Sequence, residues 1–70
     1  MIRDANLVER TLENEEIENS NIQECILIKC KIRNSNLQEC ELKECEVQNS
    51  NLQECKRDQK TSFIDCNIQQ

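Results

Sequence analysis

The sequence predicts an all-β fold, a solenoid of parallel strands that turns a corner every five residues. The first observation is an uninterrupted column of apolar residues. It consists of Ile2, Leu7, Leu12, Ile17, Ile22, Leu27, Ile32, Leu37, Leu42, Val47 and Leu52. The second is a column two positions earlier in each unit, which is small in most units and holds Ala5, Ser20, Cys25, Cys30, Ser35, Cys40, Cys45, Ser50 and Cys55.

A five-residue period fits neither a helix nor a flat strand. On an α-helix each step of five residues turns by roughly 140°, so the apolar side chains would spiral around every face. The heptad repeat of a coiled coil does not match it. In a flat strand an odd period sends successive apolar residues to opposite faces. A chain that bends once per unit keeps the same position inside.

Each unit is expected to contribute one short extended segment and one corner. Residues two apart on an extended segment share a face, so the small residue and the apolar centre point inward and the residue between them points outward. The outward positions are polar, as in Asn21, Lys31, Asn36, Glu41, Glu46 and Asn51. Gln, Glu, Asn and Lys fill the corners, where an Asn side chain can bond to nearby backbone.

The register breaks once, after Leu52, because the next centre falls on Arg57. One residue inserted within 56–60 restores it. Phe63 and Ile68 then become apolar centres, with Thr61 and Cys66 as their small companions. We interpret the charged segment KRDQK as a solvated one-residue bulge or loop at a corner rather than as a binding site.

The units Ala5-Asn6-Leu7, Ser20-Asn21-Ile22, Ser35-Asn36-Leu37 and Ser50-Asn51-Leu52 resemble the A(D/N)LXX repeat of the pentapeptide repeat family. The resemblance implies a right-handed quadrilateral parallel β-helix, with four pentapeptides in each square coil. Fourteen units would give about three and a half coils in a single domain, 1–70, with strands stacked about 4.8 Å apart. Arg10 and Glu15 stand at inward sites of the first coil, so that coil is irregular or the two side chains pair across its open end.

A twenty-residue coil would sort the interior into four faces and give the following predicted core: Leu7, Leu12, Ile17, Ile22, Cys25, Leu27, Cys30, Ile32, Leu37, Cys40, Leu42, Cys45, Val47, Leu52, Cys55, Phe63, Cys66 and Ile68. The heptapeptide that begins with Asn-Ser-Asn recurs every fifteen residues, at Asn19, Asn34 and Asn49. With twenty residues to a coil, the three copies would lie on different faces, so we interpret their spacing as a trace of duplication.

All six cysteines fall on the small inward column. Zinc sites usually contain close CxxC pairs or histidine, and this sequence has neither. Stacked cysteines could approach within disulfide range, but their parallel Cβ directions would give a poor torsion. We expect reduced cysteines that act as small buried hydrophobes, with a disulfide or a metal as the open alternatives and no cofactor.

Composition argues against several functional classes. The net charge is −5, which disfavours direct binding to nucleic acid or an anionic membrane. Gly and His are absent, so the sequence lacks a phosphate-binding loop and a histidine base, and we predict a protein that is not an enzyme. No apolar run is long enough to span a membrane, and the N-terminus lacks the apolar core of a signal peptide, so we expect a cytoplasmic protein.

Two functional hypotheses remain. In the first, the module is structural and self-associates into dimers or filaments through exposed coil ends, whose unpaired edges can add further strands. In the second, it mimics DNA and binds a type II topoisomerase such as gyrase, as some pentapeptide repeat proteins do. The acidic balance agrees in sign, but seven acids and two bases lie in the segment up to Glu24, against seven of each beyond it.

Overall fold

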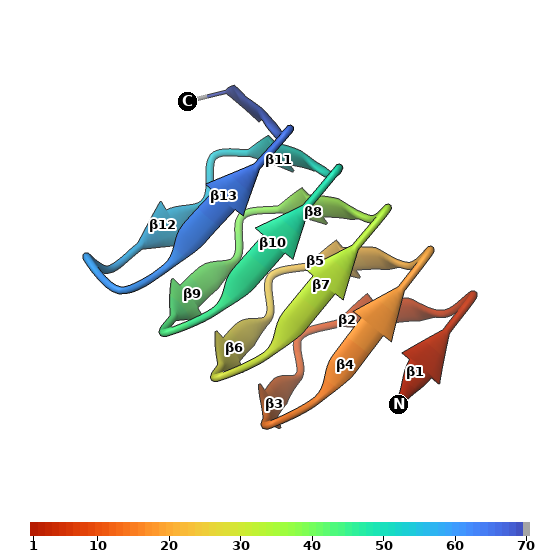
Figure 1. Cartoon of the computed structure of the whole chain (residues 1–70). Coiled ribbons are helices and arrows are strands. Elements are labelled where there is room, and N and C mark those ends of the chain that lie inside the picture. Colours follow the sequence, from red (N-terminus) through yellow and green to blue (C-terminus); the bar gives the residue numbers. More distant parts are fainter. Residues whose placement is uncertain (70) are drawn as a thin grey trace.

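The computed structural model describes residues 1–69, and these form fourteen short strands and no helix (Figure 1). The strands are β1 (Ile2–Arg3), β2 (Asn6–Val8), β3 (Thr11–Glu13), β4 (Glu16–Glu18), β5 (Asn21–Gln23), β6 (Ile26–Ile28), β7 (Lys31–Arg33), β8 (Asn36–Gln38), β9 (Glu41–Lys43), β10 (Glu46–Gln48), β11 (Asn51–Gln53), β12 (Lys56–Arg57), β13 (Ser62–Ile64) and β14 (Asn67–Gln69). Parallel strands stack in successive coils, and the predicted all-β solenoid is confirmed.

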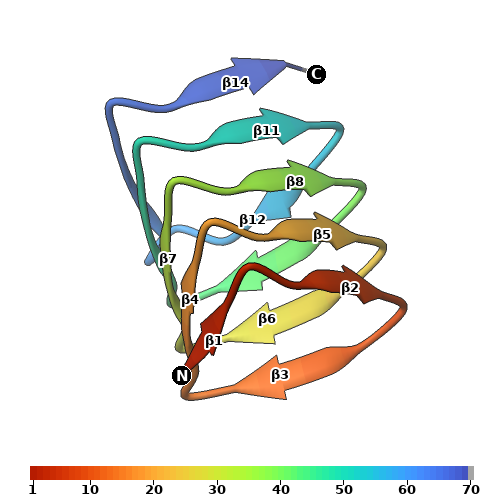
Figure 2. The same ribbon diagram turned by 90° about the vertical axis from the view of Figure 1, so that its right-hand side faces the viewer.

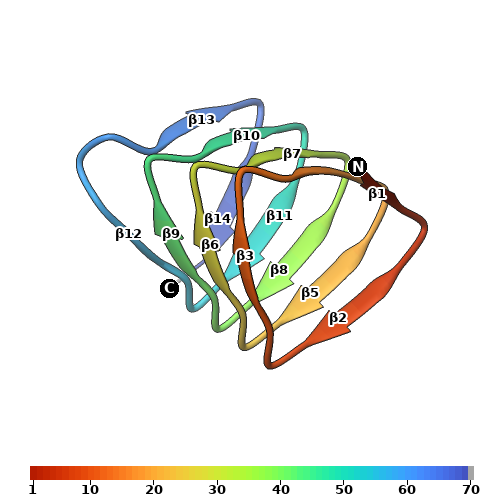
Figure 3. The same ribbon diagram turned by 90° about the horizontal axis from the view of Figure 1, so that it is seen from below.

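Each coil contains three pentapeptides. Each strand from β1 to β11 pairs in parallel with the strand three positions later, which gives the sheets β1-β4-β7-β10-β13, β2-β5-β8-β11-β14 and β3-β6-β9-β12. Viewed along the axis, these sheets form the three sides of a triangular coil (Figure 3). Seen from the N-terminal end in that view, the chain turns clockwise as it recedes, so the coil is right-handed.

The predicted quadrilateral coil and its count of three and a half turns are therefore wrong. Ile17 pairs with Ile32, and Leu37 pairs with Leu52, fifteen residues apart, so the chain makes about five turns (Figure 2). A fifteen-residue coil places like residues on one another, whereas a twenty-residue coil would stack serine on cysteine. This self-matching, in which Asn21 pairs with Asn36, is the physical advantage of three sides for this sequence.

Twelve of the corners each contain one residue in the left-handed region, with φ between 51° and 55°. Glycine adopts this conformation most easily, but the chain has no glycine. At one corner the N–H of Glu24 donates to the carbonyl of Gln38 in the next coil at 2.9 Å. The bend therefore continues the ladder of backbone hydrogen bonds between coils. Asn adopts this conformation more readily than most residues, whereas Glu gains nothing to offset its steric cost.

The apolar centres fill the interior of the coil. The buried hydrophobic residues are Leu7, Ile17, Ile22, Cys25, Leu27, Cys30, Ile32, Leu37, Cys40, Leu42, Cys45, Val47 and Leu52, and against them pack the partly buried Ile2, Ala5, Leu12, Cys55, Phe63 and Cys66. Ile68 was predicted to be core, but 44% of it is exposed. It belongs to the last described coil, so nothing covers it on one side.

The small residues sort into columns of their own. Ser20, Ser35 and Ser50 stack on one another, and the backbone N–H of Ser35 donates to Ser50 Oγ at 3.2 Å. Each hydroxyl in turn donates to the carbonyl two residues earlier, as from Ser35 to Arg33 at 2.8 Å. The buried cysteine thiols make the same contact, as from Cys40 to Gln38 at 3.2 Å. These small side chains are buried in the inner coils, whereas the larger Arg10 and Glu15 occupy the same column only in the first coil, where they reach solvent.

The register shifts by one residue between β12 and β13. Arg57 pairs fifteen residues back with Leu42, whereas Phe63 pairs sixteen residues back with Val47. The intervening loop is held by the carboxylate of Asp58, which accepts hydrogen bonds from the Thr61 hydroxyl at 2.7 Å and from the Lys60 and Glu44 backbone N–H groups at 3.2 Å. The Thr61 hydrogen bond is the main cause that lowers the pKa of Asp58.

The departures from the repeat lie where solvent is available. The side chain of Arg10 is exposed, and half-buried Glu15 accepts from the N-terminal amine of Met1 at 3.4 Å. Within residues 1–69 the two do not pair with each other. Arg57 lies outside the core, with its guanidinium 5.0 Å from the centroid of the Phe63 ring. The guanidinium lies over the face of the partly buried ring, which is the geometry of a cation–π contact.

Candidate interaction surfaces

One side of the solenoid is a continuous array of amide side chains. We call it the amide face and define it by the outward residues of β2, β5, β8, β11 and β14: Asn6, Val8, Asn21, Gln23, Asn36, Gln38, Asn51, Gln53, Asn67 and Gln69. The three Asn-Ser-Asn copies therefore lie on the same face. The prediction that they lie on different faces is wrong, because it assumed a twenty-residue coil.

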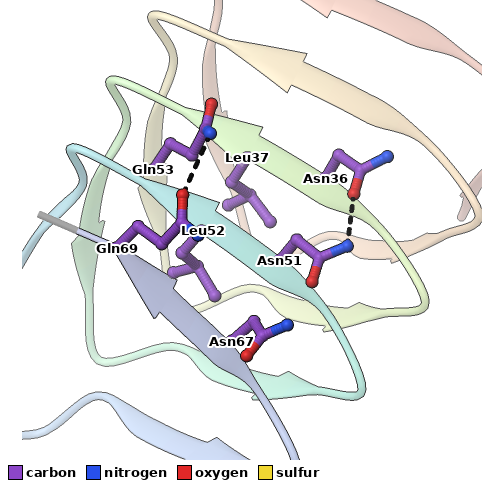
Figure 4. Close-up of a pocket in the computed structure, with 7 residues that line it drawn as sticks. All are labelled: Asn36, Leu37, Asn51, Leu52, Gln53, Asn67 and Gln69. Carbon is purple, nitrogen blue, oxygen red and sulfur yellow. Dashed lines mark hydrogen bonds between the residues drawn. The ribbon is translucent and has the colours of Figure 1, made fainter.

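The amides form two ladders that run in opposite directions. In the asparagine ladder, Asn51 donates to Asn36 at 3.0 Å (Figure 4). Asn36 in turn donates to Asn21 at 3.2 Å. In the glutamine ladder, Gln38 donates to Gln53 at 2.9 Å. Gln53 in turn donates to Gln69 at 3.2 Å (Figure 4). A primary amide has two N–H donors and two acceptor positions. Each ladder bond uses one of each, so every interior member keeps a donor and an acceptor for a partner.

Shallow grooves lie along the amide face. The C-terminal groove has a volume of about 260 Å³ and is lined by residues that include Asn51, Gln53 and Asn67. The N-terminal groove, of about 270 Å³, is lined by residues that include Asn6, Val8 and Gln38. Both reach Asn36, so together they follow the face through its stacked coils.

The amide face differs from the other two sides in charge. Its strand residues include no ionisable side chain within residues 1–69. The sheet that contains β4 and β7 carries an ion-pair network in which Glu18 contacts Arg3 at 3.1 Å and Arg33 at 3.7 Å. The remaining sheet presents Glu13, Glu41, Lys43 and Lys56. A chain with a net charge of −5 therefore has one uncharged side.

The two corners that border the amide face also differ. The corner that follows it is a stack of acids, Glu9, Glu24, Glu39 and Glu54, which we call the glutamate ridge. The corner that precedes it, the asparagine corner, is mostly neutral and holds Asp4, Asn19, Asn34, Asn49 and Asp65. Side-chain hydrogen bonds tie Asn19 to Asp4 and Asn49 to Asn34, the latter at 2.6 Å. The glutamate ridge has no such bonds among the described residues.

Residues 20–56 match the sequence profile of the family described as pentapeptide repeats, with 8 copies of the repeat. The match covers more than half of the chain and falls on the stretch in which the stacked columns are most regular. The chain belongs to the pentapeptide repeat family. Pentapeptide-repeat solenoids are generally non-catalytic structural modules. No curated protein matched the sequence.

The two ends of this pentapeptide-repeat solenoid form a second kind of surface. Within residues 1–69, β1, β2 and β3 pair on one side only, and so do β12, β13 and β14. Five large hydrophobic residues are exposed in the described chain: Met1, Val8, Ile26, Ile64 and Ile68. All except Ile26 lie in the terminal coils (Figure 1). Val8 and Ile64 are outward residues of these coils, whereas Ile68 is an inward residue, so at the C-terminal end an exposed apolar side chain lies beside unpaired strand edges.

The stacked thiols form two pairs, Cys55 with Cys40 and Cys30 with Cys45, in each of which the two pKa values shift in opposite directions. The hydrogen bond with the partner thiol lowers the pKa of Cys55 and of Cys30 to about 6. The hydrogen bond with the Cys55 thiol, together with burial, raises the pKa of Cys40 far above its ordinary value. The Cys30 thiol and burial do the same to the pKa of Cys45. A protonated, enclosed thiol is a poor nucleophile. All six cysteines are free, and residues 1–69 contain no group of three or more His, Cys, Asp or Glu side chains arranged to hold a metal.

Sequence reasoning identified the columns but missed the surface they create. The available signal was the fifteen-residue recurrence, which places Asn36 between Asn21 and Asn51 and Gln38 between Gln23 and Gln53.

The described residues also contain no helix long and apolar enough to cross a membrane.

Proposed function

We propose that this pentapeptide-repeat solenoid is a non-catalytic assembly module that self-associates end to end, as dimers or filaments. The observation that carries the proposal is the concentration of exposed apolar side chains in the coils whose strands have a free edge. An edge of unpaired N–H and C=O groups is a template for another chain. A second copy supplies strands of matching length.

Two arrangements satisfy these edges. Head-to-tail stacking continues the parallel pairing of all three sheets, and β14 of one copy then meets β2 of the next, with Ile68 over Leu7. That contact is heterologous and leads to an open filament. Head-to-head stacking is isologous and closes at a dimer. Particle mass distinguishes them, because only the first grows with concentration.

The ends are small, so the association should be weak. The backbone at either end covers a rectangle of at most about 19 by 24 Å. The area of that rectangle is smaller than the roughly 800 Å² that each partner of a standard interface buries. We therefore expect dissociation constants between about 1 μM and 1 mM for a single end contact.

The test uses two matched lysine substitutions. Ile68→Lys places a charge on the apolar tip of the last described coil, whereas Ile26→Lys places one on the side wall at a residue of similar exposure, 38% against 44%. We expect sedimentation velocity from about 10 μM to 1 mM to show association of the native chain, weakened at least tenfold by Ile68→Lys and unchanged by Ile26→Lys. A native chain that stays monomeric throughout, or equal effects of the two variants, contradicts the proposal.

The glutamate ridge supports a second candidate, a DNA mimic that binds a type II topoisomerase such as gyrase. Its four carboxylates repeat once per coil, roughly 4.8 Å apart along the axis. This acidic line was not apparent from the charge distribution along the chain. We expect the chain, in molar excess, to inhibit supercoiling by gyrase, and Glu24→Gln with Glu39→Gln to weaken the inhibition. Unimpeded supercoiling at excess removes this candidate.

A further inference from the structure

We propose that the amide face is a lateral pairing surface whose occupant is the amide face of a second copy of this chain. This contact lies on a different side from the end-to-end contact of the proposed function and does not depend on it. The inference starts from the two ladders, whose interior amides each retain an unused donor and acceptor. A surface with equal numbers of both is complementary to itself.

Spacing restricts the partner. The outward amides repeat once per coil, at the separation of neighbouring strands, roughly 4.8 Å. Only a partner with the same repeat keeps every amide opposite a bonding group over several coils. Paired β-sheets with stacked Asn and Gln side chains form tight interfaces of this kind when their repeats are identical. A second copy of the chain meets that condition because its coils have the same spacing.

Charge also selects this side. Two copies with a net charge of −5 each repel one another, and a contact through either of the other two sides would in addition take ionised side chains out of water. The amide face has no ionisable residue in its described strands, so a contact confined to these strands buries no charged side chain, and the acids lie at its two borders. Its interior residues Asn36 and Gln38 are exposed and available for contact.

The bordering corners determine the orientation. If the two-fold axis lies parallel to the coil axis, the glutamate ridge of one copy faces the asparagine corner of the other, and asparagine ladder faces glutamine ladder. If the two-fold axis is perpendicular to the coil axis, Glu39 and its neighbours confront the same residues of the partner. Like-charge contact disfavours the second arrangement. The pair therefore has parallel coil axes, with both N-termini at the same end.

The area of the face makes the pair weak. The backbone of the solenoid extends 24 by 19 by 19 Å, so one face is smaller than a standard interface and resembles that of a transient complex. Pairing should be visible in the range of about 0.1 to 1 mM. Chains already joined end to end would add their faces together and pair more strongly, because further contacts become intramolecular.

The experiment uses a second matched pair of substitutions in the Ile68→Lys chain, where the end contact is expected to be weakened at least tenfold. Gln38→Glu charges the centre of the amide face, and Gln48→Glu makes the same change on β10, in a neighbouring sheet. We expect sedimentation velocity to show a monomer–dimer equilibrium that Gln38→Glu weakens at least tenfold and Gln48→Glu leaves unchanged. Side-chain amide resonances of the amide face should shift with concentration, whereas those of Asn14 and Gln48 should not.

Each contrary outcome is distinguishable. If Gln38→Glu does not weaken dimerisation, or if the amide resonances do not shift with protein concentration, the pairing is overturned. The end-to-end proposal is unaffected by either result. Shifts of the same resonances on addition of a soluble oligosaccharide such as cellopentaose to the dilute monomer would assign the face to a hydroxyl-rich ligand instead. Tighter dimerisation of Glu39→Gln by tenfold or more would overturn the parallel orientation, because it would place the two ridges together.

Discussion

An Ile32→Ala chain is expected to lose about 2 to 4 kcal/mol of unfolding free energy, a large share of what a chain of this size possesses. Ile32 is fully buried at the centre of a column, between Ile17 and Val47. Truncation leaves a cavity that the coils above and below cannot fill, because hydrogen-bonded strands fix their spacing. The midpoint of thermal unfolding, followed by circular dichroism, should fall by roughly 10 to 30 °C.

Two controls accompany this substitution. Lys31→Ala, on the same strand but exposed, should change the midpoint little. Leu12→Ala removes the same kind of side chain from a partly buried site in the first coil and should cost less than half as much as Ile32→Ala. If the terminal and central substitutions cost the same, the interior is not a stack whose middle coils are best packed.

Replacing Glu24, Glu39 and Glu54 together by Asn is expected to stabilise the chain by about 1 to 3 kcal/mol, which corresponds to roughly 4 to 24 °C. All three occupy corners with φ between 51° and 53°, a conformation that Asn tolerates better than Glu. The change also removes like charges that face one another between coils. The asparagine corner is the natural precedent, because Asn34 and Asn49 occupy the same backbone conformation and join by a hydrogen bond.

The matching Gln variant separates the two causes. Glu24→Gln, Glu39→Gln and Glu54→Gln together remove the charge without improving the fit to the left-handed corner. Their benefit should be smaller and should nearly disappear in 1 M salt, where the Debye length is about 3 Å. The stabilisation of the Asn variant should largely persist in 1 M salt. An Asn variant no more stable than the Gln variant would show that conformational strain at these corners is negligible.

The interior was predictable because its cause is local. A unit of five residues with one apolar centre brings Leu27 and Ile32 inside whichever way the coils are stacked, provided that one corner follows each unit. The amide face was not predictable by the same route. Whether Asn36 stacks on Asn21 depends on the number of units per coil, and both fifteen and twenty are multiples of five. The error at Ile68 has a different origin: its period is right, but among the described strands β14 pairs only with β11, so its other side is open.

The sequence by itself determined a solenoid with one corner per pentapeptide, an apolar interior and small residues beside each corner. Its period and alternation leave no other way to bury the same position in every unit. Only the tertiary structure decided that three corners close a coil. That choice depends on how far each left-handed corner turns the backbone once it is hydrogen-bonded to the coils around it, as Glu24 is to Gln38. The same choice converts a fifteen-residue recurrence into one continuous amide face.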